Sequence, residues 1–278
     1  MTGEQFEEAL GLLLRWQQIR HLEERFAGLG GQNPGHHYGE VTVARGKTGE
    51  RLGVITRALN ETLYEQFGQQ RVDDNRATTA YQELLRELGD PNALVVATTN
   101  YDRAAESALV GLGRKVFTGF PQRPNRVPIL EPERLGSTAT DVTPVIHLHG
   151  AVGWYEKDGQ VRDHMADQPY LENLGSPVVL YPDPGKDPTN DATVSGLWSQ
   201  FRAALDQADH VFVLGHSLHD PALVGAIAAA KPRKLAVTVF NDDEVARVEQ
   251  LLPGAIVVRT DFGPELDIDR AAVAGFRG

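Results

Sequence analysis

The chain contains no cysteine, and this absence removes three kinds of chemistry at once. Disulfide bonds, zinc sites built on cysteine and catalysis by a cysteine nucleophile are all excluded. Because disulfides are the usual mark of an oxidising compartment, the cytoplasm is the expected location.

Positive charge and long apolar runs are also scarce. The formal net charge is -11, which disfavours a nucleic-acid or anionic-membrane surface as the main role. The longest nearly apolar run, Ala222 to Ala230, is far too short to span a bilayer. The first residues are acidic and amphipathic, which predicts no secretory signal peptide. We therefore expect no direct nucleic-acid partner and no membrane association.

The first third of the sequence has helical periodicity. Thr2 to Gln5 forms a capping-box pattern, and apolar residues then recur at helical spacing to about Ala27. Further helices are expected at 50–68 and 77–88. We interpret the chain as a single domain, 1–278, whose residues 1–92 are mainly helical.

Residues 93–278 show a different pattern, in which short apolar runs alternate with helical segments. The runs do not alternate polar and apolar residues, which is typical of parallel strands covered on both faces. The expected strands are 93–98, 144–148, 178–181, 210–214, 235–240 and 255–259. The expected helices between them are 102–112, 196–207, 220–230 and 242–251.

This pattern predicts an α/β fold, a Rossmann-like three-layer parallel sheet with helices on both faces. Two stretches interrupt it, near 117–143 and 153–176. The first is rich in Pro and Arg, and the second is polar. Both are candidates for a lid or a small subdomain.

Polar residues follow several of the expected strands. In open α/β sheets, ligands bind outside the carboxyl ends of the strands, so these residues are the candidate site. They are Thr99, Asn100, Tyr101, Asp102, His147, His149, Gly215, His216, Ser217 and Asn241. Two amides, several imidazoles and a small Gly-Ser turn suit a ligand that carries ribose hydroxyls and phosphates.

The ordered set resembles the SIR2-like (sirtuin-related) NAD-hydrolase domains of bacterial, often antiphage, proteins. Asn100 lies within TTNYD, His149 within HLHG, and the Gly215–Ser217 turn and Asn241 follow in the family's order. The resemblance covers nearly the whole chain. It extends to the segments Val145–Trp154, Tyr181–Lys186 and Leu197–Asp220.

The resemblance implies that the chain cleaves the nicotinamide–ribose bond of NAD⁺, which is the substrate. Asn100 would then hydrogen-bond a ribose hydroxyl or the attacking water. His149 would act as a general base. The catalytic pair predicted from the sequence is therefore Asn100 and His149.

The remaining residues of the set are predicted to bind the nucleotide. Gly215 and Ser217 would let the backbone approach a phosphate closely, and His216 lies between them. Asn241 would bind the adenosine ribose. The neighbours of Asn100 belong to the same predicted set; they are Thr99, Tyr101 and Asp102.

Several of these residues also have structural interpretations. Asp102 is a candidate cap for the helix that follows it, and Asp220 before Pro221 has the pattern of an N-cap. His147 and His149 form an H-x-H pair that could bind a metal. The spacing of the familiar metal hydrolases is absent, so we expect no metal.

Two departures from the family leave the function open. The zinc-binding cysteines of protein deacetylase sirtuins are absent, which argues against deacylation. The Gly-Ala-Gly-x-Ser loop that opens the family's domain is also absent, so we expect that the chain begins about one strand and loop late. A degenerate, non-catalytic module that binds nucleotide or protein is the alternative, and a metal hydrolase built on the histidines is a third hypothesis.

The resemblance also bears on partners. SIR2-like effectors are held inactive until assembly or a partner switches them on. We expect a homo-oligomer or a separate partner sensor protein to supply that switch.

Overall fold

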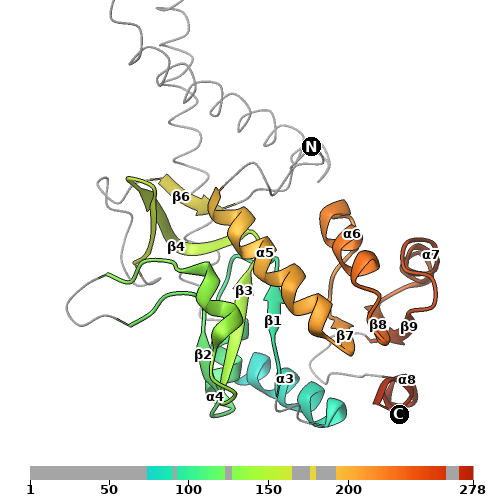
Figure 1. Ribbon diagram of the computed structural model, residues 1–278. Helices are drawn as coiled ribbons and strands as arrows, with labels where there is room; N and C mark the ends of the chain where they lie inside the picture. Colours follow the sequence, from blue (N-terminus) through green and yellow to red (C-terminus); the bar gives the residue numbers. More distant parts are fainter. Residues whose placement is uncertain are drawn as a thin grey trace, which may run out of the picture.

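A computed structural model describes residues 74–89, 93–122, 127–164, 176–179, 192–260 and 269–277 (Figure 1). The helices expected before residue 70 and the segment 181–186 lie outside the described residues. The helix expected at 77–88 is confirmed as α3, Asp74–Leu88.

The first parallel sheet has the strand order β1-β3-β2. β1 pairs with β3 from Val96↔Val145 to Thr98↔His147, and β2 pairs with the start of β3. Its elements are β1 (Val96–Thr98), α4 (Ala104–Gly111), β2 (Lys115–Phe117) and β3 (Val142–His147). β2 was not among the predicted strands, because three residues are too few to give a hydrophobic period.

The second parallel sheet has the order β7-β8-β9. Its elements are β7 (His210–Val213), α6 (Pro221–Ala230), β8 (Lys234–Val239), α7 (Asp242–Leu251), β9 (Ile256–Arg259) and α8 (Arg270–Arg277). Each strand is followed by a helix: α6 and α7 lie at the predicted segments 220–230 and 242–251, whereas α8 was not predicted. The strands expected at 210–214, 235–240 and 255–259 are confirmed within a residue.

A third sheet is antiparallel, with the order β5-β4-β6. Its strands are β4 (Gly150–Lys157), β5 (Gln160–Asp163) and β6 (Ser176–Val179). The strand expected at 178–181 was therefore wrongly placed in the parallel sheet: it runs antiparallel to β4, with Gly150 opposite Val179. The stretch expected as a polar insertion near 153–176 begins as the β4–β5 hairpin.

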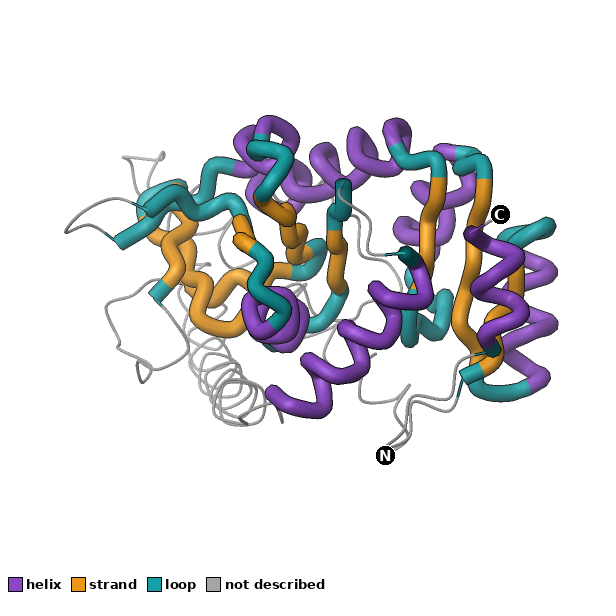
Figure 2. The backbone as a smooth tube through the Cα atoms, turned by 90° about the horizontal axis from the view of Figure 1, so that it is seen from below, coloured by secondary structure: helices purple, strands orange, loops and turns teal. Residues whose placement is uncertain are grey.

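Helices cover both faces of the parallel sheets (Figure 2). On one face, α5 (Ala192–Gln207) places Leu197 and Trp198 in one apolar cluster with Ile146 of β3 and Val213 of β7. On the other face, Leu84 and Leu85 of α3 belong to two further clusters, one with β8 and β9 and one with β3. The predicted α/β, Rossmann-like architecture is confirmed.

One part of the fold differs from the prediction. β1 was expected to be covered on both faces, yet Ala97 is exposed and Val95 is 46 % exposed. Among the described strands β1 pairs with β3 alone, and β7 pairs with β8 alone. The described strands therefore form two parallel sheets that share their covering helices, rather than one continuous sheet.

None of the helices in the described ranges is long and apolar enough to cross a membrane.

Candidate functional site

The carboxyl ends of β3 and β7 meet through one contact. His149 follows β3, and its Nε2 lies 3.1 Å from Oδ2 of Asp220, which precedes α6. Both side chains are buried, with 7 % and 8 % of their surface exposed. The contact places the ends of the two parallel sheets at a common edge.

Asp220 uses its two oxygens for different purposes. Oδ1 accepts hydrogen bonds from the backbone N–H groups of Ala222 and Leu223, at 3.0 and 3.2 Å, which confirms the predicted N-cap. Oδ2 faces His149, a role that the N-cap pattern concealed. The signal that could have revealed it is the position of an acidic residue at the same sheet edge as the histidine.

The carboxylate determines how the imidazole of His149 is used. An ionised carboxylate can only accept, so Nε2 of His149 carries the proton that points at Asp220. In the neutral ring, the basic lone pair then belongs to Nδ1. An orienting carboxylate of this kind also stabilises the imidazolium that forms when the ring takes up a proton.

The backbone around Asn100 is held firmly, while its side chain lies at the surface. The backbone N–H of Asn100 donates to Oγ1 of Thr98 at 3.0 Å, and Asn100 is exposed. On either side, the N–H of Leu148 donates to the carbonyl of Thr98, and that of Val152 to the carbonyl of Tyr101, both at 2.9 Å. The Tyr101 ring lies 6.4 Å from that of His149, so the loop after β1 reaches the same edge.

Asp102 has a structural role at the start of α4. Its Oδ1 accepts from the backbone N–H of Ala104 at 3.0 Å, where α4 begins. Arg103, rather than Asp102, occupies the N-cap position of that helix. Thr99, between this loop and β1, is partly buried.

The turn after β7 exposes Gly215 and Ser217. Gly215 has a φ of 63°, in the left-handed region that glycine adopts easily, and its N–H donates to Oγ1 of Thr238 at 2.8 Å. Nδ1 of His216 accepts from the N–H of Leu218 at 2.9 Å, and Leu218 is itself left-handed, with a φ of 57°. Ser217, between them, is exposed.

Asn241 caps a helix in this structure. Its Oδ1 accepts from the N–H of Glu244 at 2.9 Å at the start of α7, and the residue is exposed. Arg247 of the same helix donates to the carbonyl of Ser217 at 3.1 Å and contacts His219. The start of α7 therefore lies beside the turn after β7, and the ribose-binding role of Asn241 stays a prediction.

The two histidines of the H-x-H pair have separate partners. Nε2 of His147 lies 2.9 Å from Oε1 of Glu106, whereas His149 contacts Asp220. Within the part of the chain that the structure describes, no group of three or more His, Cys, Asp or Glu side chains could hold a metal ion.

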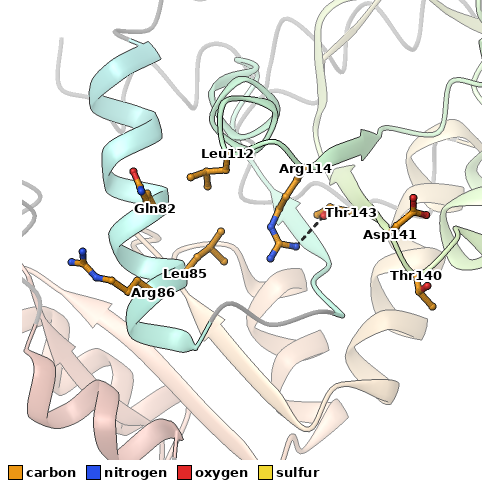
Figure 3. A pocket seen from close by; sticks show the side chains of 8 residues that line it. All are labelled: Gln82, Leu85, Arg86, Leu112, Arg114, Thr140, Asp141 and Thr143. Atoms are coloured by element: carbon orange, nitrogen blue, oxygen red, sulfur yellow. Dashed lines mark hydrogen bonds between the residues drawn. The ribbon is translucent and has the colours of Figure 1, made fainter.

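A cavity of about 850 Å³ lies elsewhere, between α3 and the starts of β2 and β3 (Figure 3). Its lining residues are Gln82, Leu85, Arg86, Leu112, Arg114, Thr140, Asp141 and Thr143. Thr143 is near the first residue of β3, whereas the predicted site follows the last residue. This cavity therefore contains none of the residues predicted to bind or cleave a nucleotide.

Comparison with protein families identifies the region that contains most of these residues. A family model described as SIR2-like domain matches residues 94–240, just over half of the chain. The matched region begins before β1 and ends after β8, so it includes Asn100, His149 and the turn after β7. No curated protein is similar enough to the chain to count as a match.

Proposed function

The chain belongs to the SIR2-like domain family, and from that premise we propose that it is an NAD⁺ glycohydrolase. It cleaves the nicotinamide–ribose bond and gives nicotinamide and ADP-ribose. The observation that carries this proposal is the His149–Asp220 contact, which sets an oriented imidazole at the edge where the Asn100 side chain is exposed.

The chemistry of the nicotinamide–ribose bond determines which catalytic groups the protein must supply. Nicotinamide leaves as a neutral molecule that takes the electron pair of the C–N bond, so the departure needs no strong general acid. The ribose carbon becomes oxocarbenium-like, and a water oxygen bonds to it. The proton that this water loses goes to His149, and the Asp220 carboxylate stabilises the resulting imidazolium.

Asn100 would orient the reactants. Its amide offers both a donor and an acceptor, so one side chain can hold a ribose hydroxyl and the attacking water together. The hydrogen bonds around Thr98 and Tyr101 fix the backbone that carries it. A rigid backbone beneath an exposed side chain limits the entropy lost when the substrate binds.

The turn after β7 would bind the phosphates. Gly215 has no side chain to obstruct an approaching phosphate, Ser217 is exposed, and α6 begins a few residues later. Asn241, at the start of the adjacent α7, would bind the adenosine ribose. Thr99, Tyr101, Asp102 and His216 would complete the surroundings of the nucleotide.

The biological setting that we propose is an antiphage effector that depletes NAD⁺ in the cytoplasm. Self-assembly or a separate sensor protein would switch it on. The expected partners are therefore NAD⁺ and either a second copy of the chain or a sensor.

The test is the release of nicotinamide from NAD⁺, measured by chromatography. We expect turnover by the wild type and a loss of about 100-fold or more in Asn100→Ala and in His149→Ala. Glu249→Gln, at an exposed position on α7, is the control and should match the wild type. Turnover that survives both substitutions would contradict the assigned roles, and NAD⁺ binding without turnover would favour the non-catalytic binding module.

A further inference from the structure

A second imidazole lies directly behind the predicted catalytic loop. His147, the last residue of β3, is completely buried. Its Nε2 lies 2.9 Å from Oε1 of Glu106 on α4, and its Nδ1 lies 3.4 Å from the backbone carbonyl of Asn100. The edge of the ring packs against Trp154, with centroids 5.3 Å apart. The Asn100 backbone is thus connected through His147 to Glu106.

The partners of His147 define how its ring is used. A backbone carbonyl can only accept a hydrogen bond, so the 3.4 Å contact with Asn100 is a hydrogen bond where Nδ1 carries a proton. Burial alone raises the pKa of the Glu106 carboxyl, but the charge of His147 and its hydrogen bond outweigh burial and hold that pKa below its usual value. Glu106 is then a carboxylate, which accepts a hydrogen bond from an N–H at Nε2.

Other charged and titratable groups surround the Glu106–His147 pair. The charge of Arg103 helps to lower the pKa of Glu106. The charges of Asp102 and Glu106 help to raise the pKa of Tyr81. Oε2 of Glu106 is buried without a hydrogen-bond partner among the described residues. Such an atom costs free energy, and an orphan polar atom in a native interior calls for a functional explanation.

From these contacts we infer that Glu106 and His147 are positioning residues that fix the backbone of Asn100 against the turn that carries His149. The inference rests on the proposed glycohydrolase function, in which Asn100 and His149 act on the same substrate. His147 holds the carbonyl of Asn100, and Glu106 holds the ring of His147. Neither side chain touches the substrate.

Glu106→Gln is the principal test variant, because it keeps the shape of the side chain and removes its charge. We expect kcat for NAD⁺ cleavage to fall about 10- to 100-fold, since small displacements of a catalytic group have effects of that size. KM should change much less than kcat, because Asn100 is only one of several groups proposed to bind the nucleotide. His147→Gln should have the same effect, and the double variant should lose no more than the larger single loss.

Hydrogen–deuterium exchange gives a readout that does not need activity. The amides of Leu148 and Val152 donate to the carbonyls of Thr98 and Tyr101, so their exchange reports whether the loop stays docked. In Glu106→Gln we expect faster exchange in peptides covering 98–103 and 147–153. Exchange in β8 should be unchanged, and the Glu249→Gln control should be unchanged throughout.

The outcomes separate this inference from the proposed function. Faster local exchange together with a lower kcat supports the positioning role. Unchanged kcat in an active enzyme, or faster exchange across the whole molecule including β8, overturns it. A wild type that neither binds nor cleaves NAD⁺ overturns the proposed function instead, and the exchange at 147–153 then decides by itself whether the pair holds the loop.

Discussion

The carboxyl ends of β3 and β7 lie at one edge of the fold but carry different groups: imidazole–carboxylate pairs at β3 and an exposed turn at β7. At the end of β3, two buried imidazoles are each paired with a carboxylate, Glu106 for His147 and Asp220 for His149. After β7, a turn with left-handed Gly215 and Leu218 exposes Gly215 and the small side chain of Ser217. The first arrangement suits proton transfer, and the second suits close approach of a phosphate.

The two parallel sheets depend on each other through the contact between His149 and Asp220. The described strands of β1-β3-β2 and β7-β8-β9 are not hydrogen-bonded to one another. Asp220 belongs to the β7 side, yet it orients the imidazole of the β3 side. The proposed chemistry of the β3 end therefore needs the β7 end in place.

The largest loss of stability is expected from a substitution at Gly150, which follows β3. A Cβ on Gly150 would lie 2.0 Å from the carbonyl oxygen of Val178, and Gly150 has a φ of 76°. Because both the clash and the backbone strain must be relieved, Gly150→Ala should lower the free energy of unfolding by about 3 kcal/mol or more.

Gly254→Ala is the matched control for this crowding. Gly254 also has a positive φ, 87°, but a Cβ there would meet nothing within 4 Å. Only backbone strain remains, which costs about 1–2 kcal/mol. Denaturant unfolding would measure both variants, and equal losses would contradict the role of the Val178 carbonyl.

The next effect separates the two roles of Asp220. Asp220→Asn keeps an oxygen for the N-cap but presents an amide N–H to His149, which forces the other tautomer of the ring. We expect NAD⁺ turnover to fall about 10- to 100-fold with stability unchanged. Initial rates and thermal unfolding, measured on the same samples, would check both expectations.

Asp220→Ala should lose activity in the same way and should also lose the cap. The free energy of unfolding should then fall by about 1 kcal/mol relative to Asp220→Asn. An Asp220→Asn enzyme with full activity would show that the His149–Asp220 contact is structural only.

A smaller effect is expected at Asn241. Asn241→Ala removes the cap of α7, which should cost about 1 kcal/mol of stability. If Asn241 also binds the adenosine ribose, KM for NAD⁺ should rise while kcat stays constant. A lower stability with an unchanged KM would leave the residue as a cap alone.

The last effect is confined to high pH. Burial, then Asp102 and Glu106, raise the pKa of Tyr81 from 10.0 to about 12. The folded protein therefore keeps a proton that the unfolded chain loses, so this contribution is full below pH 10 and is lost as the pH rises through about 12. Stability should fall between these values, and less steeply in Tyr81→Phe, as urea unfolding across the range would show.

Much of the fold could be predicted from the sequence because its signals are local. The apolar runs of β3, β7, β8 and β9 and the Asp-Pro start of α6 need only neighbouring residues. The β4–β5 hairpin was missed because its first strand continues the histidine motif without a break. The antiparallel pairing of β6 depends on Gly150, which is distant in the sequence.

In the candidate site, too, local motifs could be recognised in the sequence, whereas contacts between distant residues could not. Motifs predict Asn100 and His149 as site residues, but they do not predict the partners of these residues. His149 and Asp220 are 71 residues apart, and Glu106 and His147 are 41 apart. Only the folded chain shows that Asp220, predicted as a cap, also orients an imidazole, and that His147 supports the backbone of Asn100.

The most direct measurement is NAD⁺ cleavage in ¹⁸O-labelled water, followed by mass spectrometry of the products. If water attacks the ribose with His149 as its base, the wild type should give nicotinamide and ADP-ribose that carries one ¹⁸O. His149→Ala should give about 100-fold less of both. Nicotinamide released beside an unlabelled ribose product, or equal rates in the two proteins, would contradict the account.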